Sequence, residues 1–126
     1  METFTEKARP LAFVLSEGNG YVSREVLTIA SGSGKLGAGT LLGKITASGK
    51  HTFSPNASTV GIEGAETAVA ILGYPVDATS ADVQVACIAN HAEVKDPMLI
   101  VHSTVNDSTK RNTKLTQLRA VGIKAR

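Results

Sequence analysis

The chain has 126 residues, a net charge of +2 and a hydrophobic fraction of 42%, which fit one soluble domain with a packed core. The small charge excess argues against a protein that binds nucleic acid mainly through phosphates, and the single cysteine, Cys87, excludes an internal disulfide. The N-terminal residues match neither a signal peptide nor a membrane span, so we expect no membrane association and folding in a reducing cytoplasm.

Residues 1–20 differ in composition from the rest of the chain. A charged stretch leads into the short apolar run of residues 11–15, and a turn-like Glu17-Gly18-Asn19-Gly20 follows. The apolar run is too short for an independent helix, although Leu11, Phe13 and Leu15 would share one face of an extended strand. We predict a flexible N-terminal arm over residues 1–20 and a β-rich domain over residues 21–126. The alternative is that the segment forms an N-terminal edge strand of the same domain.

From Val22 onward, short β-branched segments alternate with Gly, Pro, Asn and Ser, which is typical of an all-β domain. We predict strands near residues 22–30, 40–47, 67–72, 82–89 and 98–105. In the fourth strand Cys87 falls on the same face as Val83 and Val85, so we interpret it as a small buried hydrophobic residue.

One helix is predicted near the C-terminus. Asp107 or Ser108 supplies an N-cap, Leu115, Leu118 and Val121 recur every three residues, and Gly122 ends the pattern. Residues 107–126 contain six Lys or Arg against one acid, which gives +5 there and −3 for the rest of the chain. The cations include Lys110, Arg111, Lys114 and Arg119, which form either a solvated face or a contact patch.

No motif assembles a catalytic, cofactor or metal site. Gly32, Gly34 and Gly37 match a dinucleotide-binding pattern, but a β-like stretch follows where a helix is needed, so we predict a hairpin loop. The histidines His51, His91 and His102 lack metal-ligand spacing. A thiol–imidazole pair of Cys87 and His91 would need an exposed, electropositive thiol, whereas Cys87 is expected to be buried. We therefore predict that the protein is not an enzyme and has no cofactor.

The order of the segments resembles the phage head decoration protein D family over nearly the whole chain. The matching pieces run from FVLSEGNGYVSR through EVLTIASG, LGAGTLLGKITASGKH, ETAVAILGYPVDAT and Ala92-Glu93-Val94 to the closing LRAVGIKAR. The turn at Ala38-Gly39-Thr40 with Gly43, and the stretch Val76-Asp77-Ala78-Thr79, carry most of the resemblance.

The resemblance implies a mainly β, β-clip type domain with a short C-terminal helix and a mobile N-terminal arm. It also implies a homotrimer that binds the major capsid protein on the exterior of the expanded phage head and stabilises it, after synthesis in the host bacterial cytoplasm. The arm would then contact the capsid, through Phe4, Lys7, Arg9, Leu11, Phe13 and Leu15. A nucleic-acid-binding β module that uses the C-terminal cations, or a ligand- or glycan-binding module, remains the alternative.

Overall fold

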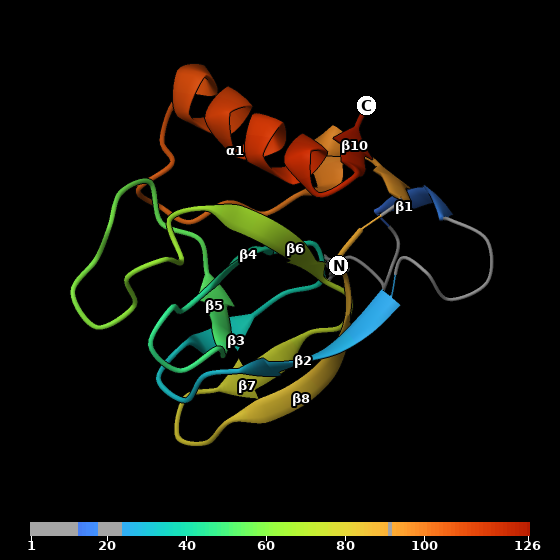
Figure 1. Ribbon diagram of the computed structural model, residues 1–126. Coiled ribbons are helices and arrows are strands. Elements are labelled where there is room, and N and C mark those ends of the chain that lie inside the picture. Colours follow the sequence, from blue (N-terminus) through green and yellow to red (C-terminus); the bar gives the residue numbers. More distant parts are fainter. Residues whose placement is uncertain (1–12, 18–23, 91) are drawn as a thin grey trace, which may run out of the picture.

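The computed structural model describes residues 13–17, 24–90 and 92–126, and Figure 1 shows their arrangement. Five strands close into a barrel in the order β2, β5, β4, β6, β8. Neighbouring strands are antiparallel except β2 and β5, which pair in parallel. The barrel strands are β2 (Arg24–Ile29), β4 (Leu41–Lys44), β5 (His51–Phe53), β6 (Ala68–Leu72) and β8 (Val83–Ile88).

Two small sheets flank the barrel. In the first, β3 (Gly34–Leu36) pairs antiparallel with β7 (Val76–Ala78). In the second, β9 (Ala92–Val94) lies between β1 (Val14–Glu17) and β10 (Ile123–Ala125). A single turn of 3-10 helix, η1 (Asp96–Met98), follows β9, and α1 (Ser108–Ala120) lies across β6 in Figure 1.

Both faces of the barrel sheet carry buried side chains, which form two separate clusters. One cluster of buried residues lies among the barrel strands and β7: Ile29, Leu42, Ala70, Leu72, Ala78 and Cys87. A second cluster joins the barrel to α1 and the three-stranded sheet: Phe13, Leu41, Ala68, Ile71, Ile88, Ala92, Val94, Leu99, Leu118 and Ile123. Side chains alternate between the faces of a strand, so Leu41 and Leu42 belong to different clusters.

The structure confirms the predicted C-terminal helix, which is α1. Asp107 adopts an extended conformation, and its Oδ1 accepts a hydrogen bond from the Lys110 amide at 2.8 Å, as an N-cap residue does. Gly122 has a φ of 87° just beyond Val121, a left-handed conformation that glycine adopts without steric cost. Leu118 is fully buried, whereas Leu115 and Val121 are partly buried against the second cluster.

The predicted strands near residues 22–30, 40–47, 67–72 and 82–89 correspond to β2, β4, β6 and β8. The strand predicted near residues 98–105 is wrong. Pro97 lies in η1, and beyond it Ile100 makes an isolated parallel bridge to Thr40 before a turn in which Val105 donates to the His102 carbonyl. Leu99 is buried in the second cluster, Met98 and Val101 pack against it, and Ile100 is 45% exposed.

The N-terminal part of the described chain lies within the fold. Phe13 is 1% exposed and packs in the second cluster, and Val14–Glu17 pair with β9. The Lys95 amide also donates to the Phe13 carbonyl at 2.6 Å. The flexible arm expected over residues 1–20 therefore includes a stretch that behaves as an edge strand of the domain, the alternative left open above. Residues 1–12 lie outside the described residues.

Candidate functional site

The residues expected to contact the capsid fall into three groups. Phe4, Lys7, Arg9 and Leu11 lie outside the described residues. Leu15 is part of β1, but its side chain is not described. Phe13 is 1% exposed and packs in the second cluster, and its predicted contact with a partner stays a prediction.

Strand β1 forms one edge of its sheet. It pairs on one side with β9, with an irregularity in register between Val14 and Ser16, and no described strand pairs with its other side. An edge strand leaves main-chain donors and acceptors that can pair with an added strand. Among the described residues, the outer edge of β1 is thus an edge without a partner strand.

The C-terminal cations do not form a continuous solvated face, because Lys114 is 1% exposed. Its Nζ donates to the Ser54 hydroxyl at 2.9 Å and to the carbonyl oxygens of Pro55 and Glu66, each at 2.5 Å. Burial lowers the pKa of Lys114, and the nearby Glu66 carboxylate opposes that shift. The sequence does contain a signal for this burial, since Lys114 lies four residues before Leu118 and shares its helix face.

Other basic side chains near the C-terminus are also engaged within the chain. Arg111 donates from Nε and Nη2 to Asp96 Oδ1, at 2.9 and 2.7 Å. Arg126 forms an ion pair of 2.8 Å with Glu93, and Lys110 Nζ donates to Asn106 Oδ1 at 2.9 Å. These basic side chains therefore already have partners within the chain. Binding to nucleic acid needs cations that contact successive phosphates, so these bonds weaken the nucleic-acid alternative.

The glycine-rich segment leads into a strand. Gly32 and Gly34 have φ values of 89° and 80°, and the chain turns through them from β2 into β3. A strand therefore follows where the motif needs a helix N-terminus. The predicted hairpin loop is wrong in one respect, because β3 pairs with β7 and not with β2.

The nucleophilic and imidazole groups of the described residues are dispersed. Cys87 is 1% exposed, and burial raises the pKa of its thiol to about 11, which confirms its structural interpretation. His102 stacks on Phe53 with ring centroids 4.3 Å apart, and its Nδ1 lies 2.8 Å from Thr104 Oγ1. Among the described residues, no three His, Cys, Asp or Glu side chains gather as metal ligands would. His91 lies outside these residues.

A surface groove of about 670 Å³ runs beside the two-stranded sheet. Leu36, Ala38, Pro75, Val76 and Ile100 supply an apolar lining, and Lys35 and Asp77 are its charged residues. Ile100 is 45% exposed, although its backbone is fixed: its amide donates to the Gly39 carbonyl, and its carbonyl accepts from the Leu41 amide, each at 2.9 Å. The groove is therefore an apolar recess on a rigid support.

An open strand edge and an apolar groove on a small β-barrel are typical of a protein that binds other proteins. The family model of the bacteriophage lambda head decoration protein D matches residues 3–123. The chain belongs to this family of structural proteins of the phage head. A comparison with curated proteins found no match. No helix in the described part of the chain is long and apolar enough to cross a membrane.

Proposed function

We propose that this protein binds the outer surface of the expanded phage head as a homotrimer and stabilises it against the pressure of packaged DNA. The observation that carries the proposal is the family match over residues 3–123. The partner is the major capsid protein, and the protein acts as a structural part of the virion with no catalytic role. It is made in the host bacterial cytoplasm before it joins the capsid exterior, consistent with its single cysteine, which has no disulfide partner in the chain.

The N-terminal segment is the proposed capsid-contact element. Phe4, Lys7, Arg9 and Leu11 lie in residues 1–12, and Leu15 lies in the edge strand that follows. Phe13 anchors the base of this arm in the core. A capsid segment that pairs with the open side of β1, or with residues 1–12 in an extended conformation, would gain main-chain hydrogen bonds, while the alternating side chains would provide specificity.

Attachment through three copies explains why weak contacts suffice. Once one arm of a trimer is bound, the other two bind as intramolecular events, and avidity rises by about 10² to 10⁴ when all sites can be reached together. A shell whose subunits have a different spacing cannot engage all three arms. Binding should therefore depend on the expansion state of the head.

Cosedimentation with purified heads tests this function. The protein is mixed with expanded heads that lack decoration and, in parallel, with unexpanded heads at the same subunit concentration. We expect saturable binding to expanded heads, greater resistance of those heads to heat, and little binding to unexpanded heads. Equal binding to both forms, or none to either, would contradict the proposal.

A further inference from the structure

The loop between β5 and β6 is closed at its base by one buried ammonium group. Lys114 Nζ donates both to the Pro55 carbonyl, where the loop begins, and to the Glu66 carbonyl, where it ends. The Ser54 hydroxyl accepts from Lys114 and donates to the Ala65 carbonyl at 2.7 Å. Loops whose ends are held together in this way are compact and are often functional.

Close backbone packing reinforces the base of this loop. A Cβ at Gly43 would overlap the backbone of Ala65, so β4 and the end of the loop approach more closely than any larger residue allows. Gly64 has a φ of +100°, and a Cβ there would lie 2.8 Å from the Lys44 carbonyl oxygen. The loop is thus fixed to the barrel through its own backbone.

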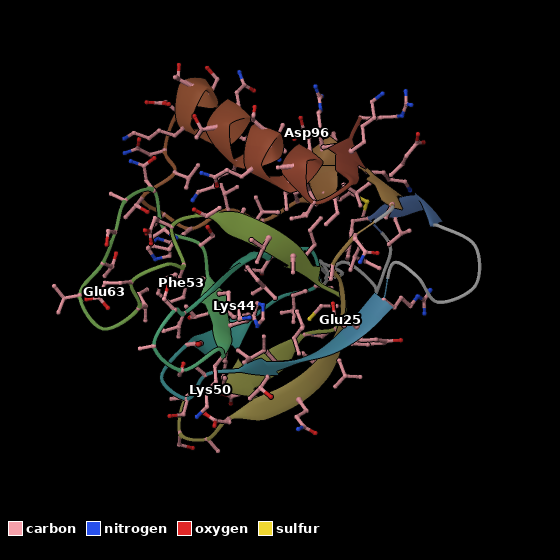
Figure 2. The ribbon with its side chains drawn as sticks, viewed as in Figure 1. Glu25, Lys44, Lys50, Phe53, Glu63 and Asp96 are labelled. Atoms are coloured by element: carbon pink, nitrogen blue, oxygen red, sulfur yellow. The ribbon has the colours of Figure 1, made fainter. Side chains whose placement is uncertain are left out.

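The tip of the loop presents an apolar side chain to solvent. Val60 is 95% exposed, the largest value among the exposed large hydrophobic residues. The backbone around it is ordered by internal bonds: Ile62 donates to the Thr59 carbonyl at 3.1 Å, and Gly61 donates to Glu63 Oε1 at 3.2 Å. Figure 2 shows Glu63 on this loop, on the opposite side of the view from β1. The tip is therefore a preformed projection.

The groove described above is the matching recess of the same chain. None of its lining residues belongs to the loop, so a copy does not fill its own groove with its own loop tip. Ile100 lines the groove, and Tyr74, 39% exposed, directly precedes its lining residue Pro75. The described residues include four exposed large hydrophobic side chains: Val26, Val60, Tyr74 and Ile100. Only Val26, on β2, belongs neither to the loop tip nor to the surroundings of the groove.

The charges of loop and groove are also complementary. Glu63, beside the tip, is exposed, and Lys35 is an exposed cation at the groove. The other charged residue there, Asp77, already accepts hydrogen bonds from the Thr79 amide and hydroxyl, at 3.2 and 2.5 Å. An approaching loop would therefore meet an apolar recess edged by the exposed Lys35, which lies opposite Asp77 on β7 and would attract the Glu63 carboxylate as well.

We propose that the loop tip of one copy inserts Val60 into the groove of the next copy, beside Ile100, around a closed ring of three. The inference rests on the proposed homotrimer and adds to it the surface that forms the ring. A projection and a recess at different places on one chain make a head-to-tail contact, which closes into a ring when the rotation between copies allows it. The occupant of the groove is thus a second copy of this chain.

Engineered cysteines test the contact directly, because Cys87 is buried and does not interfere. The doubly substituted protein Val60→Cys/Ile100→Cys should form covalent trimers under mild oxidation. A mixture of the two single variants should give dimers that contain one chain of each. Val26→Cys/Ile100→Cys is the matched control, because Val26 is 69% exposed on β2, and it should not crosslink into trimers. Crosslinking of the control alone, or of neither protein, would overturn the inference.

Substitution with a charged residue separates this inference from the proposed function. Val60→Asp and Ile100→Asp should each shift the mass in light scattering from trimer to monomer, with Val26→Asp still a trimer, and far-UV circular dichroism should confirm that all three are folded. If the wild-type protein is a monomer, the proposed trimer fails. If the wild-type protein is a trimer and both variants remain trimers while losing only head binding, the groove belongs to the capsid contact and the inference fails.

Discussion

Lys114 is a charged residue in a fully buried position. A lysine on a helix is ordinarily solvated, yet this one is buried and donates to three acceptors at the base of the loop between β5 and β6. A buried cation of this kind persists when its hydrogen bonds offset the loss of hydration. Composition alone could not predict this, because the acceptors are residues 54, 55 and 66, whose position depends on the tertiary fold.

Replacing Lys114 by methionine should therefore destabilise the protein. Lys114→Met keeps much of the side-chain volume but leaves the Pro55 and Glu66 carbonyls without their donor, at a cost of about 2–5 kcal/mol. Urea unfolding measures the effect. Lys124→Met, at an exposed position of β10, is the control and should change stability by less than about 0.5 kcal/mol. Equal stability of the two variants would show that the Lys114 bonds contribute little.

Cys87 should act as a packing residue. Since burial raises the pKa of its thiol to about 11, a thiol reagent at pH 8 should react slowly with the folded protein and rapidly after unfolding. Cys87→Ser places a hydroxyl among apolar neighbours and should cost about 1–3 kcal/mol in urea unfolding. Cys87→Ala should bind heads like the wild type. A folded Cys87→Ala protein that failed to bind would show that the thiol has a role beyond packing.

His51 should make the protein sensitive to acid. Burial, and next the nearby Lys44, lower the pKa of His51 from 6.5, and its buried Nδ1 has no hydrogen-bond partner among the described residues. The unfolded chain therefore binds a proton at His51 before the folded chain does, and stability falls as pH drops below 6.5. We expect a smaller loss of unfolding free energy between pH 7.5 and pH 5 in His51→Gln. An unchanged loss would assign the pH dependence to other groups, such as His102.

At the scale of elements, long periodic segments were predicted and short ones were not. The alternation around Cys87 predicted β8, and the spacing of Leu115, Leu118 and Val121 predicted α1. Strands β3, β5, β7, β9 and β10 span three residues each, too few for a period to appear. Residues 98–105 have the composition of a strand, but Pro97 and turn bonds prevent a continuous ladder.

The capsid-contact role of the N-terminal segment stays a prediction, and the structure adds to it the position of β1. Its apolar residues were identified from alternation, but alternation does not tell a partner-binding strand from an edge strand of the same domain. The burial of Phe13 depends on a space among Leu41, Leu118 and Ile123 that no local pattern reveals. The groove beside Ile100 likewise depends on segments far apart in the sequence.

Truncation at two positions separates the arm from the core. Deleting residues 1–12 should leave a folded protein with little change in melting temperature and greatly reduced head binding. Deleting residues 1–17 also removes β1 and Phe13, whose loss alone should cost about 3–5 kcal/mol. Phe13→Asp should resemble the longer deletion in thermal melts. If deleting residues 1–12 left head binding intact, the arm would not be the anchor.

At the scale of the whole molecule, the two proposed contacts use different parts of the surface. In Figure 1, β1 lies on one side of the view, and the loop between β5 and β6 lies on the opposite side. The first is the proposed contact with the shell, and the second is the proposed contact between copies. In the proposed trimer, this separation would leave the N-terminal segment of each copy available to the capsid.

Electron cryomicroscopy of expanded heads, before and after addition of the purified protein, tests the central claim most directly. We predict new density on the outer surface at the three-fold and quasi-three-fold positions, with one barrel per capsid subunit and a connection from the base of β1 into the shell. Density at other positions or on the inner surface, or no added density at saturating protein, would contradict the account.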